Sequence, residues 1–317
     1  MIFWCLAVVY IFPKWGWIFC IFLTAAQKNI QTGWGFNQHL TFIKSKDPKN
    51  IRVLSWNVNQ FVYGNKYDAG WKEKQEKMLQ FIRESESDIL CFQDFIIAYY
   101  DEQKDLLKHI NESLRYPYNY FSIDAENYGT IILSRFPIID SGRFVYQNQV
   151  KPESLAFADL LINGRKLRIY NTHLRSMYLH HNHLSAELFE KTRYIKEDTG
   201  FLFSSSRLSR LEYYDKIHTE QAFFIKKILN ASPTPFIFCA DLNAVPASFT
   251  YHHIQKGLKD AFIEKGRGWG VTYDKYFPTL RIDVLLTSPT VKTIQYDCPK
   301  LPLSDHYPIM ADLYLAN

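Results

Sequence analysis

The chain has 317 residues, of which 47% are apolar and 22% are charged. A chain with this composition can bury a large core, which excludes a disordered or collagen-like protein. Its five cysteines are too few for a disulfide-rich scaffold. The formal net charge is +5, but residues 1–50 carry five lysines and one aspartate, so the rest of the chain carries only +1. The body of the protein is therefore not a polycation.

Residues 2–26 are apolar except for Lys14, which follows Pro13. As one helix they would be about 37 Å long, longer than a bilayer core of about 30 Å. A signal peptide would carry positive charge before the apolar run, and a core helix would not be apolar on every side. A lysine at mid-membrane costs about 2.5–3.5 kcal/mol, so either Lys14 snorkels or Pro13-Lys14 is a turn between two short membrane segments. We predict a membrane-associated segment over residues 1–26.

Residues 27–50 are polar and basic without clear periodicity, and we expect them to form a linker beside the membrane. Four lysines beyond the apolar run favour the cytoplasmic side for the body of the protein. The sequence leaves open which side of the membrane the body faces, because further membrane spans before residue 1 would change the orientation.

From residue 51 onward, short β-rich runs alternate with amphipathic stretches. Residues 71–85 have the spacing of a helix, with Met78, Leu79 and Ile82 among charged residues. A long helical stretch is expected between 174 and 235. No repeat or linker divides residues 51–317, which predicts one mixed α/β domain. The expected strands are 51–58, 88–95, 130–136, 155–162, 166–174, 235–243, 281–288 and 309–315.

Polar residues recur where these apolar strands end. One aspartate after a strand is ordinarily a turn residue, but repeated Asp, Asn and His at strand ends indicate a site held by a rigid sheet. Oxygen-rich side chains suit Mg²⁺ or Mn²⁺ better than zinc. The residues are Asn57, Asp94, Asn171, His173, Asp241 and Asn243, with Asp283 inside a strand and Asp305 and His306 before the last strand.

Several reaction classes lack their sequence motifs. The chain has no HExxH or CxxC for zinc, no GxxxxGK[ST] or strand-linked GxGxxG for a nucleotide, and no GxSxG nucleophile elbow. Metal-assisted attack of water on a phosphoester is the chemistry that remains.

Seven segments carry a family resemblance in the family's order: SWNV (55–58), DILCFQD (88–94), ILSRFPI (132–138), NTHL (171–174), ADLN (240–243), RIDVLL (281–286) and SDHYPI (304–309). The set resembles the endonuclease/exonuclease/phosphatase (DNase I-like) superfamily over residues 51–317. With its apolar N-terminus the chain looks like a membrane-attached bacterial member. The resemblance implies a four-layer sandwich of two packed mixed β-sheets flanked by helices, and localisation at a bacterial inner membrane.

The resemblance also implies a role for each matching residue. Asn57, Asp94 and Asp305 would hold Mg²⁺ or Mn²⁺, directly or through water. Asp241 would activate the attacking water, and Asn243 would fix that water or the phosphate. His173 and His306 would bind and stabilise the phosphoryl group, while Asp283 would hydrogen-bond His306.

Two positions depart from the family pattern. Asp94 stands where the family usually has Glu, so the carboxylate is one methylene shorter and the metal would shift, gain a bridging water or bind more weakly. Ala240 stands where Gly is usual. Neither change removes a functional group, which favours a metal-dependent hydrolase over a catalytically weakened binding or scaffolding protein. No protein partner is implied.

The substrate is the least determined feature. A nuclease needs affinity for a polyanion, and phosphate contacts dominate that affinity. A body with a net charge of +1 offers little attraction of this kind, although net charge does not fix its distribution. The sequence therefore favours a phospholipid headgroup or small phosphoester, with DNA or RNA as the alternative.

Overall fold

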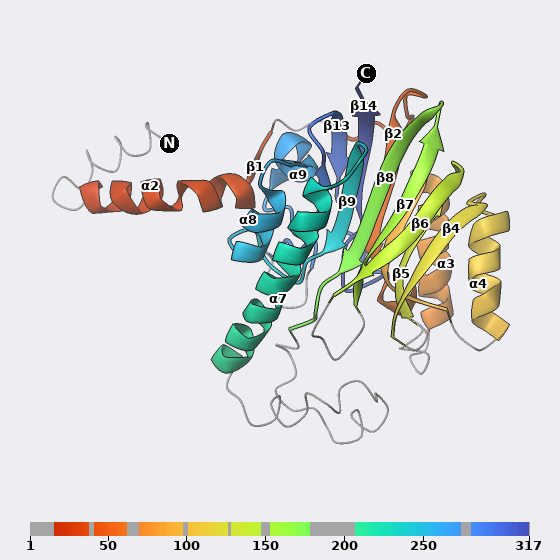
Figure 1. The fold of residues 1–317 in the computed structure, drawn as a ribbon, viewed down its shortest axis with the longest axis horizontal. Coiled ribbons are helices and arrows are strands. Elements are labelled where there is room, and N and C mark those ends of the chain that lie inside the picture. The colour runs from red at the N-terminus through yellow and green to blue at the C-terminus, as the bar shows by residue number, and fades with distance from the viewer. Residues whose placement is uncertain are drawn as a thin grey trace.

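The computed structural model describes residues 16–37, 41–61, 70–97, 101–125, 128–146, 153–177, 207–273 and 280–316. Two six-stranded sheets pack face to face, with helices on both outer faces (Figure 1). This arrangement confirms the predicted four-layer sandwich and the mixed character of both sheets. All strand pairs within these sheets are antiparallel except β2–β3 and β8–β9, which are parallel.

Each sheet has one parallel pair near its centre. The first sheet has the order β13 (Val291–Asp297), β14 (Ile309–Leu315), β2 (Ile51–Asn57), β3 (Ile89–Ile96), β5 (Tyr128–Ser134) and β4 (Tyr118–Ala125). The second has the order β10 (Lys259–Asp260), β12 (Asp283–Thr287), β9 (Phe236–Asp241), β8 (Arg165–His173), β7 (Ser154–Ile162) and β6 (Ile138–Val145).

The helices cover the outer faces of the two sheets. Helices α3 (Trp71–Ser85) and α4 (Asp101–Glu112) cover the first sheet, and α7 (Arg207–Asn230) and α8 (Phe249–Gln255) cover the second (Figure 1). A short helix, α9 (Ala261–Lys265), follows β10. The predicted helix over 71–85 is confirmed. Of the stretch expected to be helical between 174 and 235, residues 178–206 lie outside the described residues.

Alternating side chains of the central strands enter different apolar layers. In β2, Val53 joins the core between the sheets, whereas Leu54 and Trp56 pack under α3 and α4. In β9, Cys239 faces the other sheet and Phe238 packs under α7 and α8. Both faces are buried, which is why these strands have continuously apolar sequences.

Besides the two-residue strands β1 (Gly35–Phe36), β10 and β11 (Arg267–Gly268), the prediction missed β4, β6 and β13. Strands β4, β6 and β13 lie beside only one long strand each, and the side chains of β6 and β13 are buried only intermittently. Their sequences are therefore not continuously apolar. A search for continuous apolar runs finds central strands and overlooks peripheral ones.

The N-terminal segment is attached to the body. Helix α2 (Gly16–Gly33) runs through the boundary expected at residue 26, and β1 (Gly35–Phe36) pairs with β11 (Arg267–Gly268). The buried Arg281 guanidinium donates to the Thr32 carbonyl at 2.8 Å and pairs with Asp260 at 2.8 Å. Residues 32–37 are thus held against the body.

No helix within the described residues is both long and apolar enough to cross a membrane. Residues 1–15, which hold much of the predicted membrane-associated segment, lie outside the described residues.

A buried ion pair ties the start of β2 to β14 and to residues 43–44. Arg52 pairs with Asp312 through Nε at 2.6 Å and Nη2 at 2.9 Å, and its guanidinium also donates to the carbonyls of Ile43 and Lys44. Both charged side chains are nearly fully buried. Removing one partner would leave a buried charge with too few hydrogen bonds.

We therefore expect Arg52→Met to lower the free energy of unfolding by about 3–5 kcal/mol, because Asp312 loses its counter-charge. Urea unfolding followed by circular dichroism measures this change. Lys77→Met is the control, since Lys77 pairs with Glu73 on the exposed face of α3, where water screens the two charges and the pair contributes little. Equal losses in the two variants would contradict the prediction.

Candidate functional site

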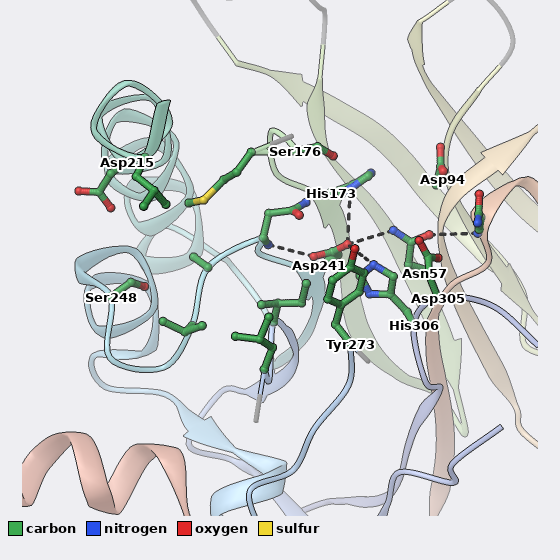
Figure 2. A pocket seen from close by; sticks show the side chains of 18 of the residues that line it. Asn57, Asp94, His173, Ser176, Asp215, Asp241, Ser248, Tyr273, Asp305 and His306 are labelled. Atoms are coloured by element: carbon green, nitrogen blue, oxygen red, sulfur yellow. Dashed lines mark hydrogen bonds and ion pairs between the residues drawn. The ribbon is translucent and has the colours of Figure 1, made fainter. Parts of the chain in front are cut away.

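The site lies where the parallel strands of both sheets end. Strands β2 and β3 end at Asn57 and Ile96, and β8 and β9 end at His173 and Asp241. Carboxyl ends of neighbouring parallel strands meet at one edge of a sheet, and here the edges of the two sheets adjoin. Figure 2 shows the resulting cluster around Asp241.

Asp241 is the centre of the cluster and is fully buried. Its Oδ2 receives a hydrogen bond from Asn57 Nδ2 at 3.0 Å and lies 3.4 Å from His173 Nε2 and 3.6 Å from His306 Nε2. Its Oδ1 accepts the backbone N–H of Asn243 at 2.9 Å. Three polar side chains thus converge on one carboxylate oxygen.

Asn243 shapes the turn that follows β9. Its backbone has a positive φ of 46°, a region that asparagine tolerates better than most residues. Its side-chain Nδ2 donates to the Leu174 carbonyl at 2.9 Å, which ties this turn to the residue after His173. The structure therefore places Asn243 as a brace of the Asp241 and His173 loops, and it also lines the cavity.

His306 is buried and is oriented by Asp283. The His306 Nδ1 lies 2.9 Å from Asp283 Oδ2, and Asp283 is held by the contact of its backbone N–H with Thr272 Oγ1 at 3.1 Å. Burial by itself lowers the pKa of His306, but the charges of Asp283 and Asp241 outweigh it and raise the pKa to about 10. His306 is therefore an imidazolium at neutral pH, with Nε2 directed towards Asp241.

Asp94 reaches the cavity because β3 contains a bulge. The register with β5 shifts between Phe92 and Phe95, and Asp94 has a φ of +49°. A bulge of this kind redirects a side chain out of the regular alternation of a strand. Asp94 lines the same cavity as Asp241, on the far side of Asn57 as seen from Asp241 (Figure 2).

The residues around Asp94 fit a divalent cation. Burial raises the pKa of Asp94, and the negative charges of Asp305 and Asp241 raise it further, against the opposing influence of His173 and His306. None of the described residues donates a hydrogen bond to the Asp94 carboxylate. A half-buried carboxylate near two others, without a donor among the described residues, has the chemistry of a ligand for a hard cation. Asn57, whose Oδ1 accepts the backbone N–H of Asn59 at 3.0 Å, and Asp305 line the same cavity.

A second group also offers metal ligands. Asp241, Asp283 and His306 each provide a ligand atom, all within 4.8 Å of one another. A histidine must be neutral to bind a metal, however, and the raised pKa of His306 favours the imidazolium. The described residues thus offer two groups of side chains that could hold a cation, one with Asp94 and one with Asp241, Asp283 and His306.

One expected residue lies outside the cluster. Asn171 is fully buried and donates to the carbonyls of Phe92 and Ile131, both at 3.0 Å, while its Oδ1 accepts from Gln93 at 2.7 Å. These bonds join the two sheets beneath the site. Asn171 is a structural link between the sheets.

The cluster opens into a cavity of about 810 Å³. Sequence reasoning missed the residues of its far side, because they are ordinary apolar, hydroxyl or acidic residues of loops and helices without a motif. Tyr273 packs on His306 with ring centroids 4.8 Å apart. The other missed lining residues include Ser176, Met177, Leu211, Glu212, Asp215, Val245, Ser248 and Leu280.

The arrangement defines an α/β sandwich protein with a site of carboxylates, amides and histidines at its strand ends. The model of the Endonuclease/Exonuclease/phosphatase family matches residues 54–306. The chain belongs to this family. No curated protein sequence matches the chain.

Solved structures support the fold at low sequence identity. The family protein from Bacteroides vulgatus has a TM-score of 0.60 and 19% identity, over 84% of this chain and 99% of that one. Danio rerio TDP2 complexed with single strand DNA product has a TM-score of 0.59 and 16% identity, over 84% of this chain and 99% of that one. The human Nocturnin catalytic domain with bound sulfate anion has a TM-score of 0.58 and 19% identity, over 84% of this chain and 94% of that one. At these identities the likeness shows the fold alone.

The pKa of His306 is directly measurable. In EDTA-treated protein we expect the histidine ring signals in NMR spectra to titrate near pH 10 for His306, and near or below neutrality in Asp283→Asn, because the main counter-charge is gone. The raised pKa stabilises the fold fully below about pH 6.5, and this contribution disappears as the pH rises through about 10.

Asp140→Asn, which changes an exposed carboxylate on β6, is the control and should leave the titration unchanged. A wild-type His306 that titrates near its ordinary value of 6.5 would contradict the assignment.

Proposed function

We propose that this protein is a divalent-metal-dependent hydrolase of phosphoester bonds. The observation that carries the proposal is the convergence of Asn57, His173 and His306 on Asp241 Oδ2. A carboxylate in this position can hold a water molecule against a phosphoryl group bound by the histidines. Membership of a family of phosphoester hydrolases supports the same chemistry.

In the proposed reaction, Asp241 orients water and accepts its proton at the carboxylate. The water oxygen forms a bond to phosphorus, the bond between phosphorus and the leaving oxygen breaks, and the leaving oxygen takes up a proton from solvent water to depart as the alcohol. The His306 imidazolium and His173 contact the phosphoryl oxygens, where negative charge grows in the transition state. A cation held by Asn57, Asp94 and Asp305, with Mg²⁺ or Mn²⁺ as the proposed metal, would neutralise phosphate charge.

A lipid-derived or small phosphoester is the proposed substrate class. Among the described residues that line the cavity there is no lysine or arginine, and Glu212 and Asp215 add negative charge. Such a lining attracts a single phosphate through the metal and histidines but offers no further phosphate contacts.

Nucleic acid is the alternative substrate, because the solved D. rerio TDP2 holds a single strand DNA product. Plasmid nicking at low enzyme concentration that disappears in Asp241→Asn would favour the alternative.

The catalytic test compares variants on a general phosphodiester with Mg²⁺. Asp241→Asn and His306→Ala should each reduce turnover by at least about 10²-fold, because the first removes the base and the second a charge next to the phosphoryl group. Asp140→Asn should retain full turnover, and EDTA should abolish it until Mg²⁺ or Mn²⁺ is restored. Turnover that survives EDTA, or that is equal in all variants, would refute the mechanism.

We also propose attachment to a bacterial inner membrane through residues 2–26. The described part of this segment supports it: Trp17, Ile21 and Phe22 of α2 are 56%, 58% and 69% exposed, and residues 16–27 carry no charge. Exposed apolar groups on a projecting helix (Figure 1) lose contact with water in a lipid environment.

The full-length protein is therefore expected to stay with the membrane fraction after carbonate and high-salt washes. Ile21→Asn combined with Phe22→Asn should release part of it, whereas Leu161→Asn, on the exposed face of β7, should not. Full-length protein that remains in the supernatant without detergent would refute the attachment.

A further inference from the structure

The cavity beside Asp241 is lined by two unlike groups of side chains. The catalytic end is lined by the polar cluster of Asn57, Asp94, His173, Asp241 and His306. The lining also contains apolar side chains, here together named the apolar subsite: Met177, Leu211, Ala244, Val245, Leu280 and Ile282. The proposed hydrolysis involves only residues of the polar cluster and assigns no role to the apolar subsite.

The apolar subsite is built from the same segments as the catalytic residues. Ala244 and Val245 follow Asn243, whose backbone N–H is bound to Asp241 Oδ1 and whose side chain is bound to the Leu174 carbonyl. Ile282 directly precedes Asp283, and its backbone N–H contacts Thr272 Oγ1 at 3.0 Å. The subsite is therefore held at a fixed position relative to the catalytic carboxylate.

Helix α7 forms the facing wall. Leu211 is 39% exposed although it lines the cavity, so a ligand that covered it would remove apolar surface from water. Figure 2 shows Asp215 on α7 and Ser248 beside α8 across the cavity from the catalytic cluster. Glu212 and Asp215 make a second anionic group on the ligand unfavourable at this wall.

We propose that the apolar subsite binds an alkyl or aryl group esterified to the phosphate that the catalytic end holds. The substrate class is then an apolar phosphoester with one phosphate and no further negative charge. This inference rests on the proposed function, because it takes the phosphoryl group to be bound by the metal and histidines. It names Leu211 and Val245 as the residues that determine specificity.

The test measures binding rather than turnover. Butyl-, hexyl- and octylphosphonate, which carry no hydrolysable ester, are titrated into the full-length protein with Mg²⁺ by calorimetry. Each added methylene should lower the Kd about two- to fourfold, as expected for burial of apolar surface. Heptylphosphonate should bind more tightly than 6-carboxyhexylphosphonate, which ends in a negative charge. In the double variant Glu212→Gln, Asp215→Asn, the difference in Kd between these two phosphonates should be smaller.

Variants show which residues cause the dependence of Kd on chain length. Leu211→Asn and Val245→Thr should each flatten the dependence of Kd on chain length while leaving the Kd of methylphosphonate unchanged. Leu161→Asn is the matched control, because Leu161 is 40% exposed, almost the same as Leu211, but does not line the cavity. The control should keep the wild-type dependence.

The outcomes separate this inference from the proposed function. A Kd independent of chain length, a dependence that survives in both Leu211→Asn and Val245→Thr, or no binding of any phosphonate would overturn the apolar subsite. Chain-length-dependent binding without hydrolysis of any phosphoester would support the subsite and overturn the hydrolase.

Discussion

Burial of the Asp241 carboxylate is the constraint on which the site depends. A carboxylate without access to water is strongly unfavourable unless donors surround it. Here the donors and counter-charges come from different segments: Asn57 from β2, His173 from β8, the backbone of Asn243, and His306 from the loop before β14. These segments converge only when both sheets are formed and packed, so the catalytic geometry follows from the assembly of the sandwich.

The packing of the sheets is fixed by polar as well as apolar contacts. Gln93 donates to Ser55 within its own sheet and to Asn171 of the other sheet, and Asn171 donates back to two strand carbonyls. Hydrogen bonds in a buried layer have a strict geometry, because an unsatisfied partner is costly there. They therefore set the sheets in one register, whereas apolar contacts alone tolerate sliding.

The N-terminal helix and the site share an anchor. Arg281 lies two residues before Asp283, and its guanidinium joins Asp260 of the body to the Thr32 carbonyl of α2. The segment that orients His306 is thus continuous with the segment that holds the projecting helix. In the membrane-attached enzyme that we propose, this connection would couple the position of the helix to that of the cavity.

The sequence by itself determined the central strands, the helix over 71–85 and the polar residues of the cluster around Asp241. Strands such as β2 and β9 are buried on both faces, so their continuous apolarity is visible without a structure. The ordered motifs likewise placed Asp241, His306 and Asp283 in one site. These properties are local, because they depend on residue type and spacing along the chain.

Only the tertiary structure decided the peripheral strands, the attachment of the N-terminal segment and the composition of the cavity wall. Peripheral strands such as β6 are only partly buried, so their pattern is weak, and the attachment of residues 32–37 to the body depends on partners more than 200 residues away. The bulge at Asp94 and the structural role of Asn171 depend on neighbouring strands. Leu211 and Val245 carry no motif, and only folding places a helix and a loop around one cavity beside Asp241.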